Sequence, residues 1–114
     1  MSKKVNWGYF RNGWNSCKKA QEVLDAKNIS VEKLVLANKE KINSDDAWEL
    51  MGFASLIRTG KGKKFQTWIP NPENKNEILK DVIGPSGNLR APTWRIGKEF
   101  IVGFNPELYK EVFG

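Results

Sequence analysis

The stretch that decides the fold is Tyr9-Phe10-Arg11-Asn12-Gly13-Trp14-Asn15-Ser16-Cys17-Lys18-Lys19-Ala20. Residues 5–10 are β-branched and aromatic, which predicts a strand leading into it. A turn is predicted over residues 11–13. Apolar positions 17, 20, 23 and 24 then share one face of a helix predicted over residues 15–28, with Asn15 or Ser16 as N-cap and Asn28 at its end. The stretch therefore predicts a strand–loop–helix unit with Cys17 in the first helical turn.

The remainder of the chain alternates short apolar runs with turn signals. A second strand is predicted over residues 31–36, and a helix begins at Ser44, where two following acids suit its positive end. We also expect a short helix starting within residues 55–58, a flexible basic loop over 60–64, an extended link over 68–72, a helix over 76–83, a β-hairpin over 92–104 turning at Gly97-Lys98, and a helix starting at Asn105-Pro106. This order predicts an α/β (α+β) fold with a thioredoxin-type sheet.

Composition excludes several kinds of function. The 114 residues predict one domain, 1–114. With no histidine and one cysteine, the chain has no Ser–His–Asp or Cys–His site and no internal disulfide, and we expect no metal site. No apolar run approaches the ~20 residues of a membrane span, and the stretch after Met1-Ser2-Lys3-Lys4 is too short and mixed for a signal peptide. Because a lone thiol fits a reducing compartment, we expect a cytoplasmic protein.

Three segments resemble one known family. They are the stretch quoted above, Leu89-Arg90-Ala91-Pro92-Thr93, and Ile101-Val102-Gly103-Phe104-Asn105. In this order and spacing they resemble the arsenate reductase family of the thioredoxin superfamily, which includes glutaredoxin-coupled arsenate reductases and the redox regulator Spx. The resemblance implies a thioredoxin-like fold, a four-stranded mixed sheet flanked by helices, with an inserted helical region at about 43–83. It also implies a cis-proline at Pro92, beside which the family's backbone pairs with bound peptide or glutathione.

The chain departs from this family at the reactive position. The family's first cysteine aligns with Trp14, whose indole cannot be a nucleophile, and Cys17 falls on the second position of the motif. The family's oxyanion-binding arginine aligns with Ala91, so we do not expect arsenate reduction. The residues that the resemblance then implies for the site are Cys17 and Trp14 as the catalytic positions, and Asn15, Ser16, Lys18, Arg58, Arg90, Ala91, Pro92 and Thr93 as substrate- or thiol-binding residues.

Two interpretations of Cys17 stay open. At a helix start, beside Lys18 and Lys19, a thiolate is stabilised by the helix dipole and by positive charge, which favours a reactive cysteine. Its place on the inner helix face equally predicts a buried, inert residue. Trp14 is interpreted as an anchor for a partner, an aromatic lid, a neutral replacement, or the trace of a cysteine or selenocysteine codon one base away.

Two functions follow as hypotheses. The first is thiol–disulfide exchange through Cys17 alone, with glutathione or a thiol protein as partner and no tightly bound cofactor. The second is a non-catalytic regulatory protein that binds a partner such as RNA polymerase, as Spx does. Nucleic-acid binding by the basic loop at 60–64 is less favoured, and we expect no membrane partner. Among the tryptophans, we expect Trp14 and Trp68 to be the more exposed.

Overall fold

A computed structural model describes residues 4–114. Two predictions involve residues 1–3 and so lie outside the described residues. They are that these residues belong to the single domain and that the N-terminus is not a signal peptide. The described part of the chain forms four helices: α1 (Asn15–Ala26), α2 (Ser44–Met51), α3 (Lys75–Val82) and α4 (Pro106–Phe113). Its strands are β1 (Lys4–Val5), β2 (Trp7–Phe10), β3 (Ser30–Val31), β4 (Leu34–Leu36), β5 (Leu56–Lys61), β6 (Lys64–Trp68), β7 (Thr93–Ile96) and β8 (Glu99–Val102).

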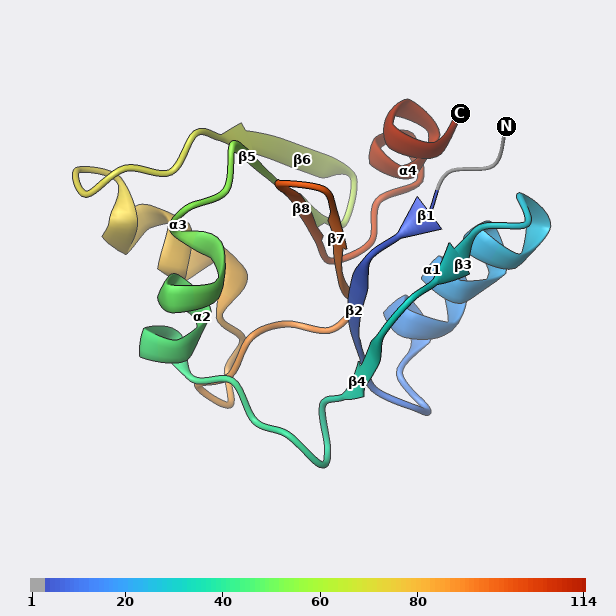
Figure 1. The fold of residues 1–114 in the computed structure, drawn as a ribbon, viewed down its shortest axis with the longest axis horizontal. Coiled ribbons are helices and arrows are strands. Elements are labelled where there is room, and N and C mark those ends of the chain that lie inside the picture. Colours follow the sequence, from blue (N-terminus) through green and yellow to red (C-terminus); the bar gives the residue numbers. More distant parts are fainter. Residues whose placement is uncertain (1–3) are drawn as a thin grey trace.

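Six of these strands form one mixed sheet in the order β4-β2-β7-β8-β5-β6 (Figure 1). Strands β2 and β4 are parallel and are connected through α1. Strand β7 runs antiparallel to β2 and forms the predicted hairpin with β8, while β5 is parallel to β8 and antiparallel to β6. The structure is therefore mixed α/β, with strands from both ends of the chain adjacent at the centre of the sheet.

The prediction of a four-stranded sheet is wrong, because residues 56–68 form a hairpin that adds two strands beside β8. The region predicted as a helical insertion, about 43–83, contains α2 and α3 together with this hairpin. The expected helix start within residues 55–58 and the flexible loop over 60–64 both fall in this hairpin. Gly62 adopts a φ of 60°, which suits a two-residue hairpin turn between Lys61 and Lys64. Buried Ile57 and Thr59 alternate with Arg58 in the strand before the turn, the period of a strand rather than of a helix.

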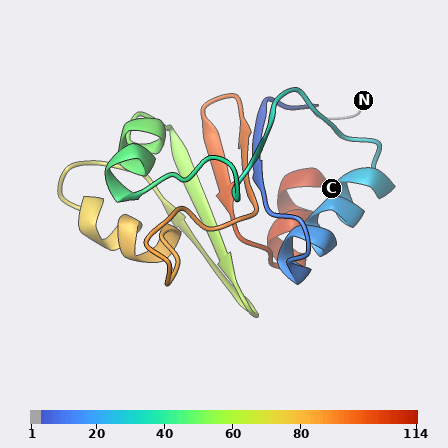
Figure 2. The same cartoon turned by 90° about the horizontal axis from the view of Figure 1, so that it is seen from below.

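The two faces of the sheet are covered by different helices (Figure 2). On one face, Leu24 of α1 and Leu108 of α4 belong to a cluster that includes fully buried Trp94. On the other face, Ala47 of α2 and Ile78 of α3 belong to a second cluster, which also contains Cys17. Packing on both faces keeps the central strands buried and leaves the ends of the sheet for loops.

Several local predictions are confirmed. Helix α4 begins after Asn105, whose side chain accepts a hydrogen bond from the Leu108 N–H at 2.9 Å. Asn28 follows α1 with a φ of 56°, and the Ala91–Pro92 peptide bond is cis. The predicted N-cap of α1 is wrong, because the helix starts one position earlier, at Asn15, with Trp14 in the cap position.

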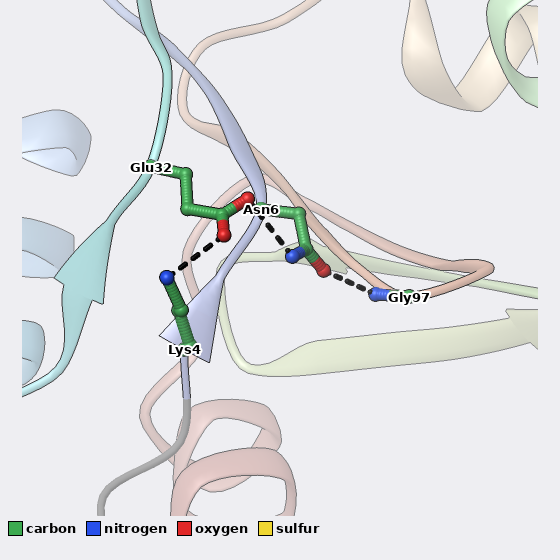
Figure 3. A network of polar contacts seen from close by, with 4 residues as sticks. All are labelled: Lys4, Asn6, Glu32 and Gly97. Atoms are coloured by element: carbon green, nitrogen blue, oxygen red, sulfur yellow. Dashed lines mark hydrogen bonds and ion pairs between the residues drawn. The ribbon is translucent and has the colours of Figure 1, made fainter.

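The first two predicted strands are each interrupted, so that β1 pairs with β3 and β2 with β4. Asn6 lies at the interruption between β1 and β2, and its side chain forms the contacts shown in Figure 3. Asn6 donates to the Glu32 carboxylate at 3.1 Å and accepts from the Gly97 N–H at 2.7 Å, while Lys4 pairs with Glu32 at 2.8 Å. These contacts tie the N-terminal strands to the β7–β8 turn.

Candidate functional site

The candidate site lies where β2 ends and α1 begins. Because β2 and β4 are parallel, their carboxyl ends share one edge of the sheet, and the loops that follow both strands lie there. Trp14 is 44% exposed at this edge. The Arg11 guanidinium carbon lies 4.5 Å from the centre of the Trp14 ring, a cation–π contact that helps to hold the indole in place.

Two cavities flank Trp14. The larger has a volume of about 230 Å³ and is lined by Tyr9, Arg11, Trp14, Ala37, Asn38, Lys41, Ser86, Asn88, Leu89 and Ala91. The smaller has a volume of about 180 Å³ and is lined by Trp14, Ser16, Gly84, Pro85, Ser86, Asn88, Leu89, Arg90, Ala91 and Gly103. Trp14 and Ala91 therefore face a common region although 77 positions separate them in the sequence (91 − 14).

The chemical character of this region is cationic. Arg11 and Lys41 line the larger cavity, Arg90 lines the smaller one, and none of the described lining residues is an aspartate or a glutamate. The first turn of α1 also contains no acidic residue, and the Trp14 side chain makes no cap hydrogen bond. The amide groups that begin α1 are thus uncapped by this side chain, and they add partial positive charge to the same edge.

Ala91 offers main-chain groups to the site. It is 7% exposed and lines both cavities. Its neighbours are paired, since the Arg90 N–H bonds to the Val82 carbonyl and the Pro92 carbonyl accepts from Gly103. Within residues 4–114, the N–H and C=O of Ala91 have no backbone partner, so a bound extended chain can pair with them.

Cys17 lies behind this region and is fully buried. Its sulfur accepts a hydrogen bond from the Arg11 N–H at 3.4 Å. Burial is the largest influence on the thiol and raises its pKa, while the hydrogen bond and the charge of Arg11 act in the opposite direction. At neutral pH the thiol is therefore protonated, and it is sealed from solvent by the packing around α1.

The remaining predicted residues do not form one cluster. Arg58 forms an ion pair with Glu99 and lines a separate cavity beside Ile96, Ile101, Glu111 and Val112. Arg90 uses its guanidinium internally, donating to the carbonyls of Asp81 at 3.0 Å and Gly60 at 2.8 Å, and burial lowers its pKa. An oxyanion clamp is thus not assembled from these two arginines.

Three other predicted residues have structural or peripheral positions. Thr93 is buried and donates to the Arg90 carbonyl at 2.7 Å. Asn15 and Lys18 line a groove along the outer side of α1, away from the Trp14 cavities. Of the predicted set, Trp14, Ser16, Arg90 and Ala91 therefore share one cavity, with Cys17 and Pro92 buried.

Sequence reasoning missed the side chains that give the site its charge and shape. They are Tyr9 of β2 and, from the loops that follow β2, follow β4 and precede β7, Arg11, Asn38, Lys41, Ser86 and Asn88. A usable signal was present, because strands joined by one crossover helix are parallel and place Arg11 and the loop after residue 36 at the same edge. That signal predicts proximity of Arg11 and Lys41, although not the cavity between them.

Comparison with family models, curated proteins and solved structures found no match for this chain. No group of three or more cysteine, aspartate and glutamate residues within 4–114 is arranged to hold a metal ion. The helices described here are all too short or too polar to cross a membrane. The function is therefore argued from the site alone.

Proposed function

We propose that this protein is a non-catalytic binding protein on a thioredoxin-like scaffold, and that it recognises an extended, anionic peptide segment at Trp14. The observation that carries the proposal is the contrast between two positions of one motif. Trp14 is 44% exposed between two cavities, whereas Cys17, the chain's single thiol, is fully buried behind it. The exposed indole of Trp14 can bind a ligand by packing against it. The thiol of Cys17, which could react covalently, is not accessible to a substrate.

The strand order supports the scaffold. The central strands β4-β2-β7-β8 comprise a parallel pair joined by α1, an antiparallel hairpin, and α4 after it. This is the arrangement expected of a thioredoxin-type sheet, to which β5 and β6 are an addition. In such a scaffold the segment before Pro92 and the start of α1 face each other, and here both line the same cavities.

Charge and main-chain groups define the ligand. Arg11 and Lys41 favour carboxylates, and the unpaired N–H and C=O of Ala91 favour an extended backbone. The indole of Trp14 supplies an apolar surface on which a side chain of the ligand packs. A cytoplasmic partner protein with an acidic segment has these properties, and so does the tripeptide glutathione.

Thiol–disulfide exchange through Cys17 is the second candidate function. The Arg11 N–H bonded to Sγ and the position in the first turn of α1 favour the thiolate. Burial opposes this and is the largest influence, so that the pKa of the thiol is raised. Exchange therefore requires the first turn of α1 to open, whereas binding at Trp14 requires no rearrangement.

S-Methylglutathione tests the proposal, because it has two carboxylates and an extended backbone but no free thiol. We expect calorimetry to show binding that weakens about tenfold in Trp14→Ala and in Lys41→Ala, the loss expected for one charge-assisted contact. Lys39→Ala is the matched control, since Lys39 is an exposed lysine of the same loop that does not line the cavity. Equal affinity in Lys39→Ala and Lys41→Ala contradicts the proposed site.

Oxidised glutathione separates the two candidate functions. In a binding protein the mass of the native chain stays unchanged after incubation, because the Cys17 sulfur is inaccessible. Addition of one glutathionyl group to Cys17 in the native state, faster than global unfolding allows, supports exchange and refutes the non-catalytic function.

A further inference from the structure

Strand β6 is the outer edge of the six-stranded sheet, at the opposite end from β4 (Figure 1). It pairs with β5 on one side, and within residues 4–114 no strand pairs with its other side. Hairpin residues 61 and 64 flank a two-residue turn, so 61–64, 59–66 and 57–68 are the hydrogen-bonded pairs. The N–H and C=O groups of Phe65 and Thr67 therefore point outward, and the described backbone supplies no partner for them.

The edge has two chemically different ends. At the turn, Lys61, Lys63 and Lys64 are exposed, and in the described residues none of the three forms an ion pair. At the other end Ile69 is 69% exposed, and its carbonyl accepts from Asn74 Nδ2 at 2.9 Å, which closes the edge there. Between residues 56 and 71 the sequence contains four basic residues and no acidic one.

We propose that this edge binds an extended segment of a partner protein as an added antiparallel strand, with acidic residues opposite the lysine turn and apolar residues opposite Ile69. Outward N–H and C=O groups supply the main-chain hydrogen bonds of strand addition. The unpaired lysines select a carboxylate-bearing end, and Ile69 gains burial from an apolar one. Antiparallel pairing is the more stable arrangement and places the acidic residues at the carboxyl end of the partner segment.

The aromatic side chains of the hairpin argue for a peptide over a nucleic acid. Trp68 donates its indole N–H to Asp81 at 3.1 Å, and its ring packs against the cluster under α2 and α3. Phe65 packs against the cluster under α1 and α4. Neither ring is free to stack on a base, which single-stranded nucleic acid requires beyond its phosphate contacts.

A second copy of the chain fits the edge less well. Its β6 offers the same outward backbone groups but no carboxylate for the lysines, since residues 56–71 contain none. Lysines on an edge strand also discourage pairing between identical edges. The partner with complementary charge is therefore an acidic segment of another protein.

The test uses the peptide acetyl-Thr-Val-Thr-Val-Glu-Asp-Glu-amide with the 114-residue chain, and binding is followed by amide NMR and by calorimetry. We expect shifts centred on the amides of Phe65 and Thr67, and binding that weakens at high salt. Lys63→Glu with Lys64→Glu is expected to weaken binding at least tenfold, while Lys18→Glu with Lys19→Glu, the same change of charge at two exposed positions on α1, leaves it unchanged. Trp14→Ala leaves the shifts of the Phe65 and Thr67 amides unchanged, which separates this edge from the site at Trp14.

Backbone pairing is tested separately from charge. The same peptide with every backbone nitrogen methylated keeps its three acids but loses its donors, and we expect it to bind at least tenfold more weakly. Thr67→Pro removes an outward N–H without touching the β5–β6 ladder, and it is expected to have the same effect. Equal binding of the methylated peptide, tighter binding of a single-stranded oligonucleotide, or concentration-dependent dimerisation through β6 in place of peptide binding overturns the proposal.

Discussion

Trp14→Cys, made in a Cys17→Ala background, tests the electrostatics of the site directly. The substitution places a thiol at the cap of α1, where the first turn has no acidic residue and the cap side chain makes no hydrogen bond. The Arg11 guanidinium, which now lies 4.5 Å from the indole centre, remains beside it. Both features stabilise a thiolate, so the pKa of the new thiol is expected to lie well below that of an ordinary cysteine.

The size of the effect follows from known thiols. Helix N-termini lower the pKa of a cysteine from about 8.5 into the range of about 3.5–7.5, and we take about 7, a shift of roughly 2 kcal/mol. At pH 6 this raises the thiolate fraction about 30-fold, while the lower basicity reduces its nucleophilicity about fivefold. The expected gain is therefore about sixfold in the rate of alkylation at pH 6.

The assay is iodoacetamide alkylation from pH 5 to pH 10, followed by mass spectrometry. Lys39→Cys in the same background is the reference, because it places a thiol at an exposed loop position away from a helix start. If the pKa of the thiol introduced at residue 14 equals or exceeds that of the reference thiol, the cap of α1 does not favour anions. In that case the anionic ligand proposed for this site is also wrong.

Three further predictions concern stability, each measured by urea denaturation. Gly8→Ala is expected to destabilise the fold by about 1–3 kcal/mol, because a Cβ there lies 2.5 Å from the ring of buried Trp94, and its added cost is expected to be smaller in a Trp94→Leu background, where that ring is absent. Asn105→Ala is expected to cost about 2 kcal/mol, since this buried side chain caps α4 and donates to the Gly62 carbonyl at 2.9 Å; a cost below about 0.5 kcal/mol contradicts that role. Burial raises the pKa of Cys17, so the unfolded chain loses this proton first as pH rises above about 8.5 and stability falls; Cys17→Ala is expected to flatten that decline between pH 8 and 10, and an unchanged slope contradicts it.

The sequence predicted elements whose signals are local. The β7–β8 hairpin follows from two apolar runs around Gly97-Lys98, and the start of α4 follows from Asn105 with a proline after it. The helix after Trp14 was predicted because its apolar period is regular, and only its cap was misassigned. In each case a few adjacent residues carry enough information, and tertiary packing does not override them.

The β5–β6 hairpin shows where this approach fails. The turn at Gly62 was interpreted as a flexible loop because three lysines surround it, although lysines are common on edge strands. The alternation of buried and more exposed positions in β5 is interrupted by Gly60, which is buried where Asn105 approaches. The contact between Gly60 and Asn105 joins residues 45 positions apart, so no local sequence pattern predicts it.

The site was only partly predictable for a related reason. Helical periodicity assigns Cys17 to the inner face of the helix but does not say how deeply its side chain is buried. The degree of burial decides whether a thiol is a nucleophile or part of a core. Lys41 and Asn88 contribute to the larger cavity only because the loops after β4 and before β7 converge on Trp14. This convergence depends on the order of the strands in the sheet. Strand order results from the packing of the whole chain and cannot be inferred from any one segment.

Trp14 and Cys17 lie three positions apart, a spacing that puts neighbouring helical residues on one side. Their exposures nevertheless differ completely, because Trp14 precedes the first helical turn in extended conformation while Cys17 is inside that turn. A residue at the cap projects from the end of α1 toward the loops, and the residue three positions later faces the sheet. Chemistry and access are thus separated in this chain: the accessible group has no proton to transfer, and the group with a transferable proton is inaccessible. The binding proposed at Trp14 consequently needs no opening of α1, whereas exchange through Cys17 does.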